Sequence, residues 1–177
     1  SCFRRLASKA MSAVDSAAAP ARRTIALVGL MGVGKSTVGR RLAQRLSMPF
    51  VDADHEIEEA AGMTVADIFS SLGEAEFRAG EARVTRRLLE GPPIVLATGG
   101  GAVLRPENRA LLRRSGVLFW LDRPVADIER TLEIESRPLL AGGGSLETLR
   151  RQREALYRIC ADYAIREDTA QAAAEAI

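Results

Sequence analysis

The chain has 177 residues, 47% of them hydrophobic, which is enough for one compact domain with a full core and too few for two ordinary domains. Its 25 basic and 23 acidic side chains nearly balance, so no overall field favours nucleic acid or an anionic membrane. A single histidine excludes any multi-histidine metal site. Two distant cysteines suit a reducing compartment, and no apolar run approaches the ~20 residues of a membrane helix. We therefore expect a cytoplasmic monomer.

Residues 1–21 differ in composition from the rest of the chain. They are rich in alanine, serine and arginine, contain Asp15 as their only acidic residue, and lack the long apolar segment of a secretory signal. We predict a flexible arm there, with an organelle transit peptide as the alternative interpretation. The remaining residues, 22–177, are predicted to form a single domain.

The apolar run Thr24–Val28 is followed by Gly-Leu-Met-Gly-Val-Gly-Lys-Ser-Thr, which matches the phosphate-binding loop G-x-x-x-x-G-K-S/T at every fixed position. Glycines let such a loop turn its N–H groups onto a polyphosphate, and the following helix adds the positive end of its dipole. Lys35 is predicted to hold the β and γ phosphates, and Ser36 a magnesium ion. The predicted ATP-binding residues of the loop are Gly32, Val33, Gly34, Lys35, Ser36 and Thr37. Switch proteins, motors and small-molecule kinases share this loop, so other residues must identify the acceptor.

Strand and helix signals alternate along the chain after the arm. Apolar runs predict strands at Thr24–Val28, 50–51, 94–97, 117–121 and Tyr163–Ile165. Hydrophobic spacing and capping residues predict helices at 36–46, 56–60, 65–72, 74–90, 106–114, 125–132, 146–160 and 169–177. Strands that alternate with helices form a parallel sheet covered on both faces. The sequence therefore predicts a three-layer α/β/α fold with about five parallel strands.

Two predicted strands end in residues that suit a ligand site. The strand at 50–51 leads into Asp52 and Asp54, at the edge where open parallel sheets bind ligands. The next strand ends in the consecutive glycines 99–101, which indicates that the backbone passes very close to another group. A tight packing turn is the alternative interpretation of these glycines. The neighbouring His55 is expected to face solvent rather than to act as a base.

The segment 137–144 has the composition of a mobile loop. Arg137 suits anions, Pro138 would shape the loop, and the glycines 142–144 would act as hinges. We predict a lid at about residues 134–145.

Several further motifs follow the phosphate loop in order: Phe-Val-Asp-Ala-Asp, Gly-Glu-Ala-Glu-Phe-Arg, Ala-Thr-Gly-Gly-Gly, Trp-Leu-Asp, Arg-Pro-Leu-Leu and Arg-Glu-Ala-Leu-Tyr. Each is weak alone, but the ordered set is highly specific. It resembles the shikimate kinase family, within the nucleoside-monophosphate-kinase-like group of P-loop folds, over about residues 24–165. The resemblance implies a P-loop kinase fold with substrate-binding helices and the mobile lid.

The resemblance also implies a site for shikimate, a small cyclic acid with three hydroxyl groups. Arg78 and Arg153 resemble the pair that clamps its carboxylate, a task suited to planar guanidinium groups. Asp54 resembles the residue that binds the ring hydroxyls and would orient or deprotonate the attacking 3-hydroxyl. The remaining contacts implied for this substrate are backbone N–H groups of Gly99, Gly100 and Gly101.

On the ATP side, the resemblance implies that Ser36 ligates Mg²⁺ directly and that Asp52 holds it through water. Arg137 resembles the lid arginine that moves onto the ATP phosphates and supplies charge to the transition state. Arg130 lies where the family places an adenine-stacking arginine. The predicted catalytic residues are Lys35, Asp54 and Arg137.

The expected activity is transfer of the ATP γ-phosphoryl to the 3-hydroxyl of shikimate, in the route to chorismate and aromatic amino acids. One alternative is another small-metabolite kinase, such as a gluconate or nucleotide kinase, but a nucleotide acceptor would not require Asp54, Arg78 and Arg153 to converge on one small acid. The other is a nucleotide switch or a catalytically silent relative. The chain has no Asn-Lys-x-Asp guanine motif, and every expected chemical residue is present.

Overall fold

A computed structural model describes residues 23–131, 140 and 144–177. Its strands are β1 (Thr24–Val28), β2 (Phe50–Asp52), β3 (Val95–Ala97), β4 (Gly116–Leu121) and β5 (Tyr163–Ile165). They form one sheet in the order β2-β3-β1-β4-β5, and every pairing is parallel. The predicted five-stranded parallel sheet is confirmed. All five strands therefore end at the same edge, where a ligand site is expected.

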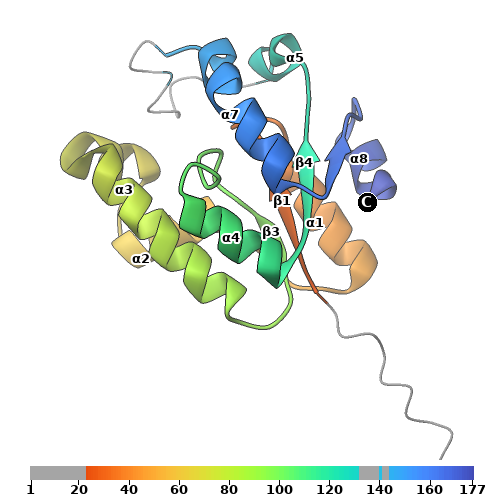
Figure 1. The fold of residues 1–177 in the computed structure, drawn as a ribbon, viewed down its shortest axis with the longest axis horizontal. Helices are drawn as coiled ribbons and strands as arrows, with labels where there is room; N and C mark the ends of the chain where they lie inside the picture. Colours follow the sequence, from red (N-terminus) through yellow and green to blue (C-terminus); the bar gives the residue numbers. More distant parts are fainter. Residues whose placement is uncertain (1–22, 132–139, 141–143) are drawn as a thin grey trace, which may run out of the picture.

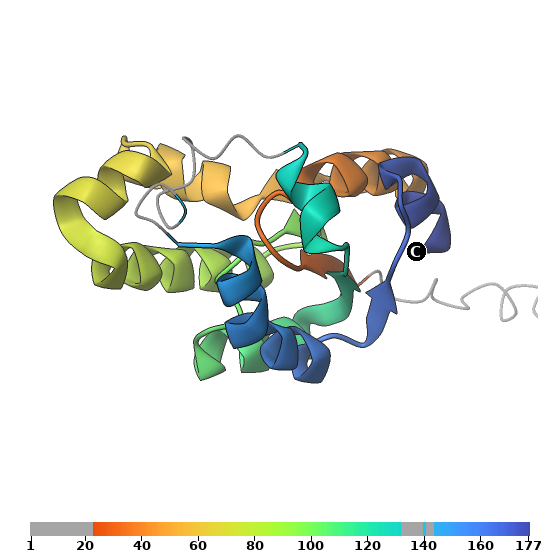
Figure 2. The same ribbon diagram turned by 90° about the horizontal axis from the view of Figure 1, so that it is seen from above.

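Helices cover both faces of this sheet (Figures 1 and 2). One face carries α1 (Lys35–Leu46) and α8 (Ala170–Ala176), and the other carries α4 (Pro106–Ser115) and α7 (Leu146–Cys160). The long α3 (Val65–Leu89) and the shorter α2 (Ala53–Ala61) pack together at the β2 end of the molecule, and α5 (Val125–Glu129) follows β4. The predicted three-layer α/β/α arrangement is confirmed.

The core lies between the sheet and its two helical layers. Leu27 and Leu118, on the central strands, are fully buried, because helices cover both faces of the sheet there. Val38 and Leu42 place the apolar side of α1 against the sheet. Leu46, in the last turn of α1, is 40% exposed. Similarly, Ile159 of α7 is 58% exposed.

Several helix boundaries differ from the predicted ones. α2 begins at Ala53 rather than 56, because Asp52 caps it, so Asp54 lies in its first turn. The two helices predicted around Gly73 are the two halves of α3, and Gly73 between them is non-helical with a φ of 83°. α5 ends at Glu129, with Arg130 as its C-cap, before the predicted end at 132. Ser145 caps α7 by accepting a hydrogen bond from the backbone N–H of Thr148, and the predicted last strand is confirmed as β5.

Two predicted segments fall largely outside the described residues. The first is the arm at 1–21. The second is the lid at about 134–145, where only Leu140, Gly144 and Ser145 are described. Leu140 is buried in the main core cluster. Across the described ranges, no helix combines the length and apolar character needed to span a membrane.

Candidate active site

The phosphate loop connects β1 to α1 at the carboxyl edge of the sheet. Gly34 is the N-cap of α1 and has a φ of 102°, a left-handed conformation that favours glycine. Lys35 begins the helix and is 8% exposed. Its Nζ donates hydrogen bonds to the carbonyl oxygens of Gly29 at 2.9 Å and Leu30 at 2.7 Å. The ammonium group is thus fixed against the loop that should hold the phosphates.

Two oxygen groups lie beside the loop, on Ser36 and Asp52. The Ser36 hydroxyl donates a hydrogen bond to Oδ2 of Asp52, and Oδ1 of Asp52 accepts one from the backbone N–H of Asp54 at 3.1 Å. A hydroxyl and a carboxylate are ligands that Mg²⁺ prefers. No group of three or more His, Cys, Asp or Glu side chains suited to a metal occurs among residues 23–131, 140 and 144–177. This donor pair therefore fits a magnesium ion completed by phosphate oxygens and water.

Arg78 lies in the second half of α3 and is 8% exposed. Its Nη1 donates to Oε2 of Glu81 at 2.8 Å, while Nε and Nη2 lie 3.3 and 3.2 Å from Oε1 of Glu74. Glu81 itself is 1% exposed, and this burial raises its pKa above 4.5 despite the opposing effect of Arg78. Two carboxylates on the same helix therefore fix the direction of the Arg78 guanidinium.

Arg153 lies on the buried face of α7 and is 3% exposed. Its Nε and Nη1 are buried and have no hydrogen-bond partner within the part of the chain that the structure describes. One turn later, Tyr157 donates a hydrogen bond to the Gly100 carbonyl at 2.5 Å and stacks on Trp120. Burial raises the pKa of Tyr157 to about 12, so the phenol keeps its proton at neutral pH. Two buried guanidinium nitrogens without a hydrogen-bond partner suit an anionic or polar ligand.

The three glycines after β3 lie where these side chains meet. A Cβ at Gly99 would lie 2.7 Å from Oε1 of Glu81 and 2.8 Å from Oδ1 of Asp54. A Cβ at Gly101 would lie 2.2 Å from Nη1 of Arg78, and one at Gly100 would lie 3.0 Å from the backbone N of Met31. The predicted close approach of backbone to other groups is confirmed, because side chains here would collide with the acidic and basic groups around the turn.

These groups surround one central cavity of about 760 Å³, a volume typical of small-molecule sites. Its lining includes Lys35, Ser36, Asp52, Asp54, Arg78, Glu81, Gly99, Gly100, Gly101 and Arg153. A flanking pocket of about 300 Å³ borders the other side of the phosphate loop. It is lined by Gly32, Val33, Gly34, Thr37, Val38, Leu121, Arg123, Thr131, Ile165, Glu167, Thr169, Ala170 and Ala173.

The central cavity and the flanking pocket bring together nearly all of the residues singled out from the sequence. Arg130 is at the end of α5, where its side chain is 75% exposed and pairs with Asp127 at 3.1 Å. Arg137 lies outside the described residues. His55 is exposed as expected, although it also lines the central cavity. Glu81 is a site residue that was not predicted from the sequence. Its position three residues after Arg78, on the same helix face, could have identified it as a partner of that arginine.

The fold and the loop define a class of protein. A phosphate loop at the carboxyl edge of a β2-β3-β1-β4-β5 parallel sheet, facing buried arginines and a carboxylate, belongs to a P-loop phosphotransferase that uses ATP. The family model described as shikimate kinase matches residues 31–177. The chain belongs to the shikimate kinase family.

Similar proteins carry the same name. A shikimate kinase of Nitrobacter winogradskyi is 56% identical over 145 residues, covering 80% of this chain and 68% of that protein. A shikimate kinase of Caulobacter vibrioides is 49% identical over 156 residues, covering 85% of this chain and 76% of that protein. The structure of shikimate kinase from Acinetobacter baumannii in complex with shikimate is 40% identical and aligns with a TM-score of 0.83, covering 88% of this chain and 90% of that one.

Proposed function

We propose that this chain transfers the γ-phosphoryl group of ATP to the 3-hydroxyl of shikimate, giving shikimate 3-phosphate and ADP. The observation that carries the proposal is Arg153, whose buried Nε and Nη1 have no partner among the described residues and which lines the central cavity with Arg78. Two guanidinium groups opposite a phosphate loop suit an acceptor that carries its own carboxylate. Shikimate is such an acid, and the complex of the Acinetobacter baumannii relative contains it.

The donor half of the site is the phosphate loop. Backbone N–H groups of Gly32 and Gly34 and the N-terminus of α1 would hold the phosphates of ATP. Lys35 would place its ammonium group on the β and γ phosphates, exchanging its carbonyl partners for phosphate oxygens. The flanking pocket, which borders the loop at Thr37, would take the rest of the nucleotide.

Ser36 and Asp52 would hold Mg²⁺ at the junction of the two halves, Ser36 directly and Asp52 through water. The metal would neutralise charge that develops on the phosphate oxygens during transfer. Both residues already point at one another across the loop, and the Asp52 carboxylate is kept in place by its bond to the start of α2.

In the acceptor half, Arg78 and Arg153 would bind the carboxylate of shikimate, and Asp54 its ring hydroxyls. Glu81 and Glu74 hold the Arg78 guanidinium, so its orientation does not depend on the ligand. Asp54 would then receive the proton of the 3-hydroxyl as the phosphoryl group is transferred. The turn of Gly99 to Gly101 would offer its backbone N–H groups to the same ligand.

Several finer assignments are part of the proposal and rest on the sequence alone. Arg137 would move onto the ATP phosphates, and Arg130 would stack on the adenine. A monomeric state and a cytoplasmic location likewise rest on composition and cysteine content, with Cys160 buried and unpaired among the described residues.

The proposal is tested by an ADP-release assay with Mg-ATP and three acceptors: shikimate, gluconate and a nucleoside monophosphate. We expect ADP release with shikimate only. Release with gluconate or the nucleotide, and none with shikimate, would contradict the proposed acceptor. No release with any acceptor would indicate a catalytically silent relative, which the relatives about 50% identical to this chain do not favour.

The role of Asp54 is tested separately by Asp54→Asn. The amide cannot accept the proton, so kcat should fall roughly 10²- to 10⁴-fold. The matched control is Glu59→Gln, which neutralises an exposed carboxylate on the same helix, α2, and should leave kcat unchanged. Retained turnover in Asp54→Asn would remove this residue from the proposed mechanism.

A further inference from the structure

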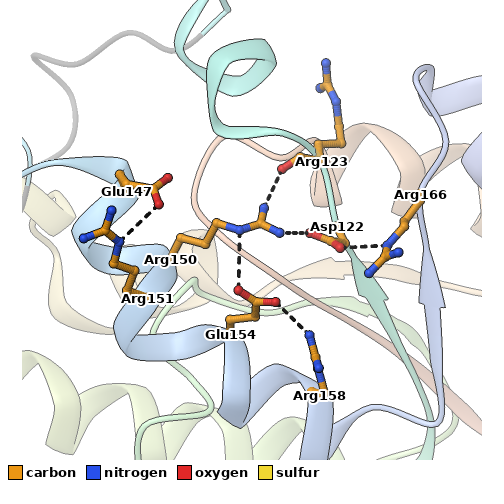
Figure 3. A network of polar contacts seen from close by, with 8 residues as sticks. All are labelled: Asp122, Arg123, Glu147, Arg150, Arg151, Glu154, Arg158 and Arg166. Atoms are coloured by element: carbon orange, nitrogen blue, oxygen red, sulfur yellow. Dashed lines mark hydrogen bonds and ion pairs between the residues drawn. The ribbon is translucent and has the colours of Figure 1, made fainter.

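A polar network of eight residues lies at the carboxyl end of β4 (Figure 3). None of them lines the central cavity, and Arg123 alone among them lines the flanking pocket. At its centre is Asp122, whose side chain is 6% exposed. Each of its two carboxylate oxygens binds a different arginine, and these arginines come from segments that are distant in sequence. Asp122 therefore connects parts of the molecule that contribute to different walls of the site.

The first connection reaches the helix that carries Arg153. Oδ1 of Asp122 accepts a hydrogen bond from Nη2 of Arg150 on α7 at 2.8 Å. Nη1 of Arg150 donates to the carbonyl oxygen of Arg123 at 3.0 Å, which ties α7 to the chain entering α5 (Figure 3). Arg150 precedes Arg153 by about one helical turn. A shift of α7 at Arg150 would therefore change where the Arg153 guanidinium points in the central cavity.

The second connection reaches the flanking pocket. Oδ2 of Asp122 accepts a hydrogen bond from Nε of Arg166 at 2.9 Å, and the backbone N–H of Asp122 donates to the carbonyl oxygen of Ile165, also at 2.9 Å. Ile165, Glu167 and Thr169 line the flanking pocket beside the phosphate loop. Asp122 thus holds the segment that forms the wall of this pocket.

The outer contacts of α7 differ from these connections. Arg151 pairs with Glu147 and Arg158 with Glu154, both within the helix, and the two arginine side chains are 79% and 65% exposed. Arg166 is similarly exposed, at 70%, but its partner Asp122 is buried and belongs to another segment, whereas the exposed pairs within α7 contribute little and link no other segment. They therefore supply a matched control on the same helix.

We infer that Asp122 is a positioning residue that aligns both halves of the site. Through Arg150 it sets the position of α7 and so of Arg153, the proposed acid-binding arginine. Through Arg166 it sets the position of the segment that forms the wall of the flanking pocket, where the nucleotide is proposed to bind. The identity of the two ligands rests on the proposed function. Because each carboxylate oxygen serves one connection, the two effects should be separable by substitution. Asp122 itself lines neither the central cavity nor the flanking pocket.

The test compares the steady-state kinetics of Arg150→Met, Arg166→Met, Asp122→Asn and the control Arg151→Met. Methionine keeps the apolar stem of each arginine and removes its charge. Arg150→Met should raise the KM for shikimate roughly three- to tenfold and leave the KM for ATP within twofold. Arg166→Met should raise the KM for ATP by the same factor and leave the KM for shikimate within twofold. Asp122→Asn should raise both KM values. Arg151→Met should match the unsubstituted chain.

Thermal unfolding and calorimetric titration with ADP accompany the kinetics. The inference is wrong if Arg150→Met and Arg166→Met lower the melting temperature but have the same KM values for shikimate and ATP as Arg151→Met. It is also wrong if each of the two variants raises the KM for shikimate and the KM for ATP equally. The two arginine variants keep the test decisive if Asp122→Asn does not fold. If the unsubstituted chain does not phosphorylate shikimate, the proposed function is wrong. In that case, ADP binding that is weakened in Arg166→Met but not in the other arginine variants still supports the connection from Asp122 to the flanking pocket.

Discussion

At the scale of single residues, the site depends on charges that are buried before any ligand arrives. Glu81 is the clearest case, because it is nearly inaccessible yet carries a carboxylate beside Arg78 and Asp54. Burial and the neighbouring Asp54 raise its pKa, while Arg78 and Arg153 lower it, and burial has the largest effect. The native state therefore binds a proton at Glu81 more tightly than the unfolded chain does.

This predicts a pH dependence of stability that belongs to Glu81. A raised native pKa gives a contribution to the free energy of unfolding that is complete below pH 4.5 and is lost as the pH rises through the native pKa. The unfolding free energy of the unsubstituted chain minus that of Glu81→Gln should therefore decrease as the pH increases above 4.5. Urea unfolding at a series of pH values measures it. An increase over that range would show that Arg78 outweighs burial.

At the scale of elements, the turn after β3 is shaped by what surrounds it rather than by its own strand. Gly101 has room for a hydrogen but not for a methyl group, because the Arg78 guanidinium occupies that space. Arg78 cannot move without leaving Glu81 and Glu74, which hold it from α3. The turn and the helix are therefore fitted to each other, and the fit sets the position of an acid-binding group.

Gly101→Ala should accordingly displace Arg78 and raise the KM for shikimate by about tenfold or more, while the KM for ATP changes little. The matched control is Gly80→Ala, which adds the same methyl group in α3, where the nearest atom, Nη2 of Arg83, is 3.8 Å away. That change should leave the kinetics unaltered and increase stability by up to about 1 kcal/mol. Steady-state kinetics and urea unfolding measure both effects. Equal KM values for the two variants would contradict the fitted turn.

At the scale of the whole molecule, the central cavity and the flanking pocket meet at one edge of the sheet. Their walls come from the phosphate loop and α1, α2, α3, the turn after β3, α7, the start of α8 and the carboxyl ends of β2, β4 and β5. A ligand bound there contacts segments that only the folded chain brings together. Binding should therefore stabilise the described fold as a unit.

Shikimate or ADP at about 100 times its Kd should add roughly 2.7 kcal/mol to the free energy of unfolding, which raises the melting temperature by about 5–10 °C. Arg153→Met should lose the increase caused by shikimate and keep the one caused by ADP. Arg151→Met, on the exposed side of the same helix, should keep both. Thermal unfolding with each ligand measures the shifts. A full shikimate shift in Arg153→Met would show that this guanidinium does not bind the acid.

The amino-acid sequence alone predicts the phosphate loop, the alternation of strands and helices, and the placement of Asp52 and Asp54 at the carboxyl end of β2. These features are local, since a loop motif, an apolar run and a capping residue act over a few neighbouring positions. The same local patterns misplaced the start of α2 and the end of α5 by three residues each, because cap geometry sets where a helix begins and ends.

Only the tertiary structure decided which charges are buried and what they face. Arg150, Arg151 and Arg153 look alike in sequence, yet Arg151 is solvated and Arg150 binds Asp122. Arg153 lines the cavity, and its buried Nε and Nη1 have no hydrogen-bond partner among the described residues. The contact of Tyr157 with Gly100 spans 57 residues of chain. Such contacts depend on how α7 packs across the sheet, and the low polarity of the packed interior turns an ordinary arginine into a site that requires an anion.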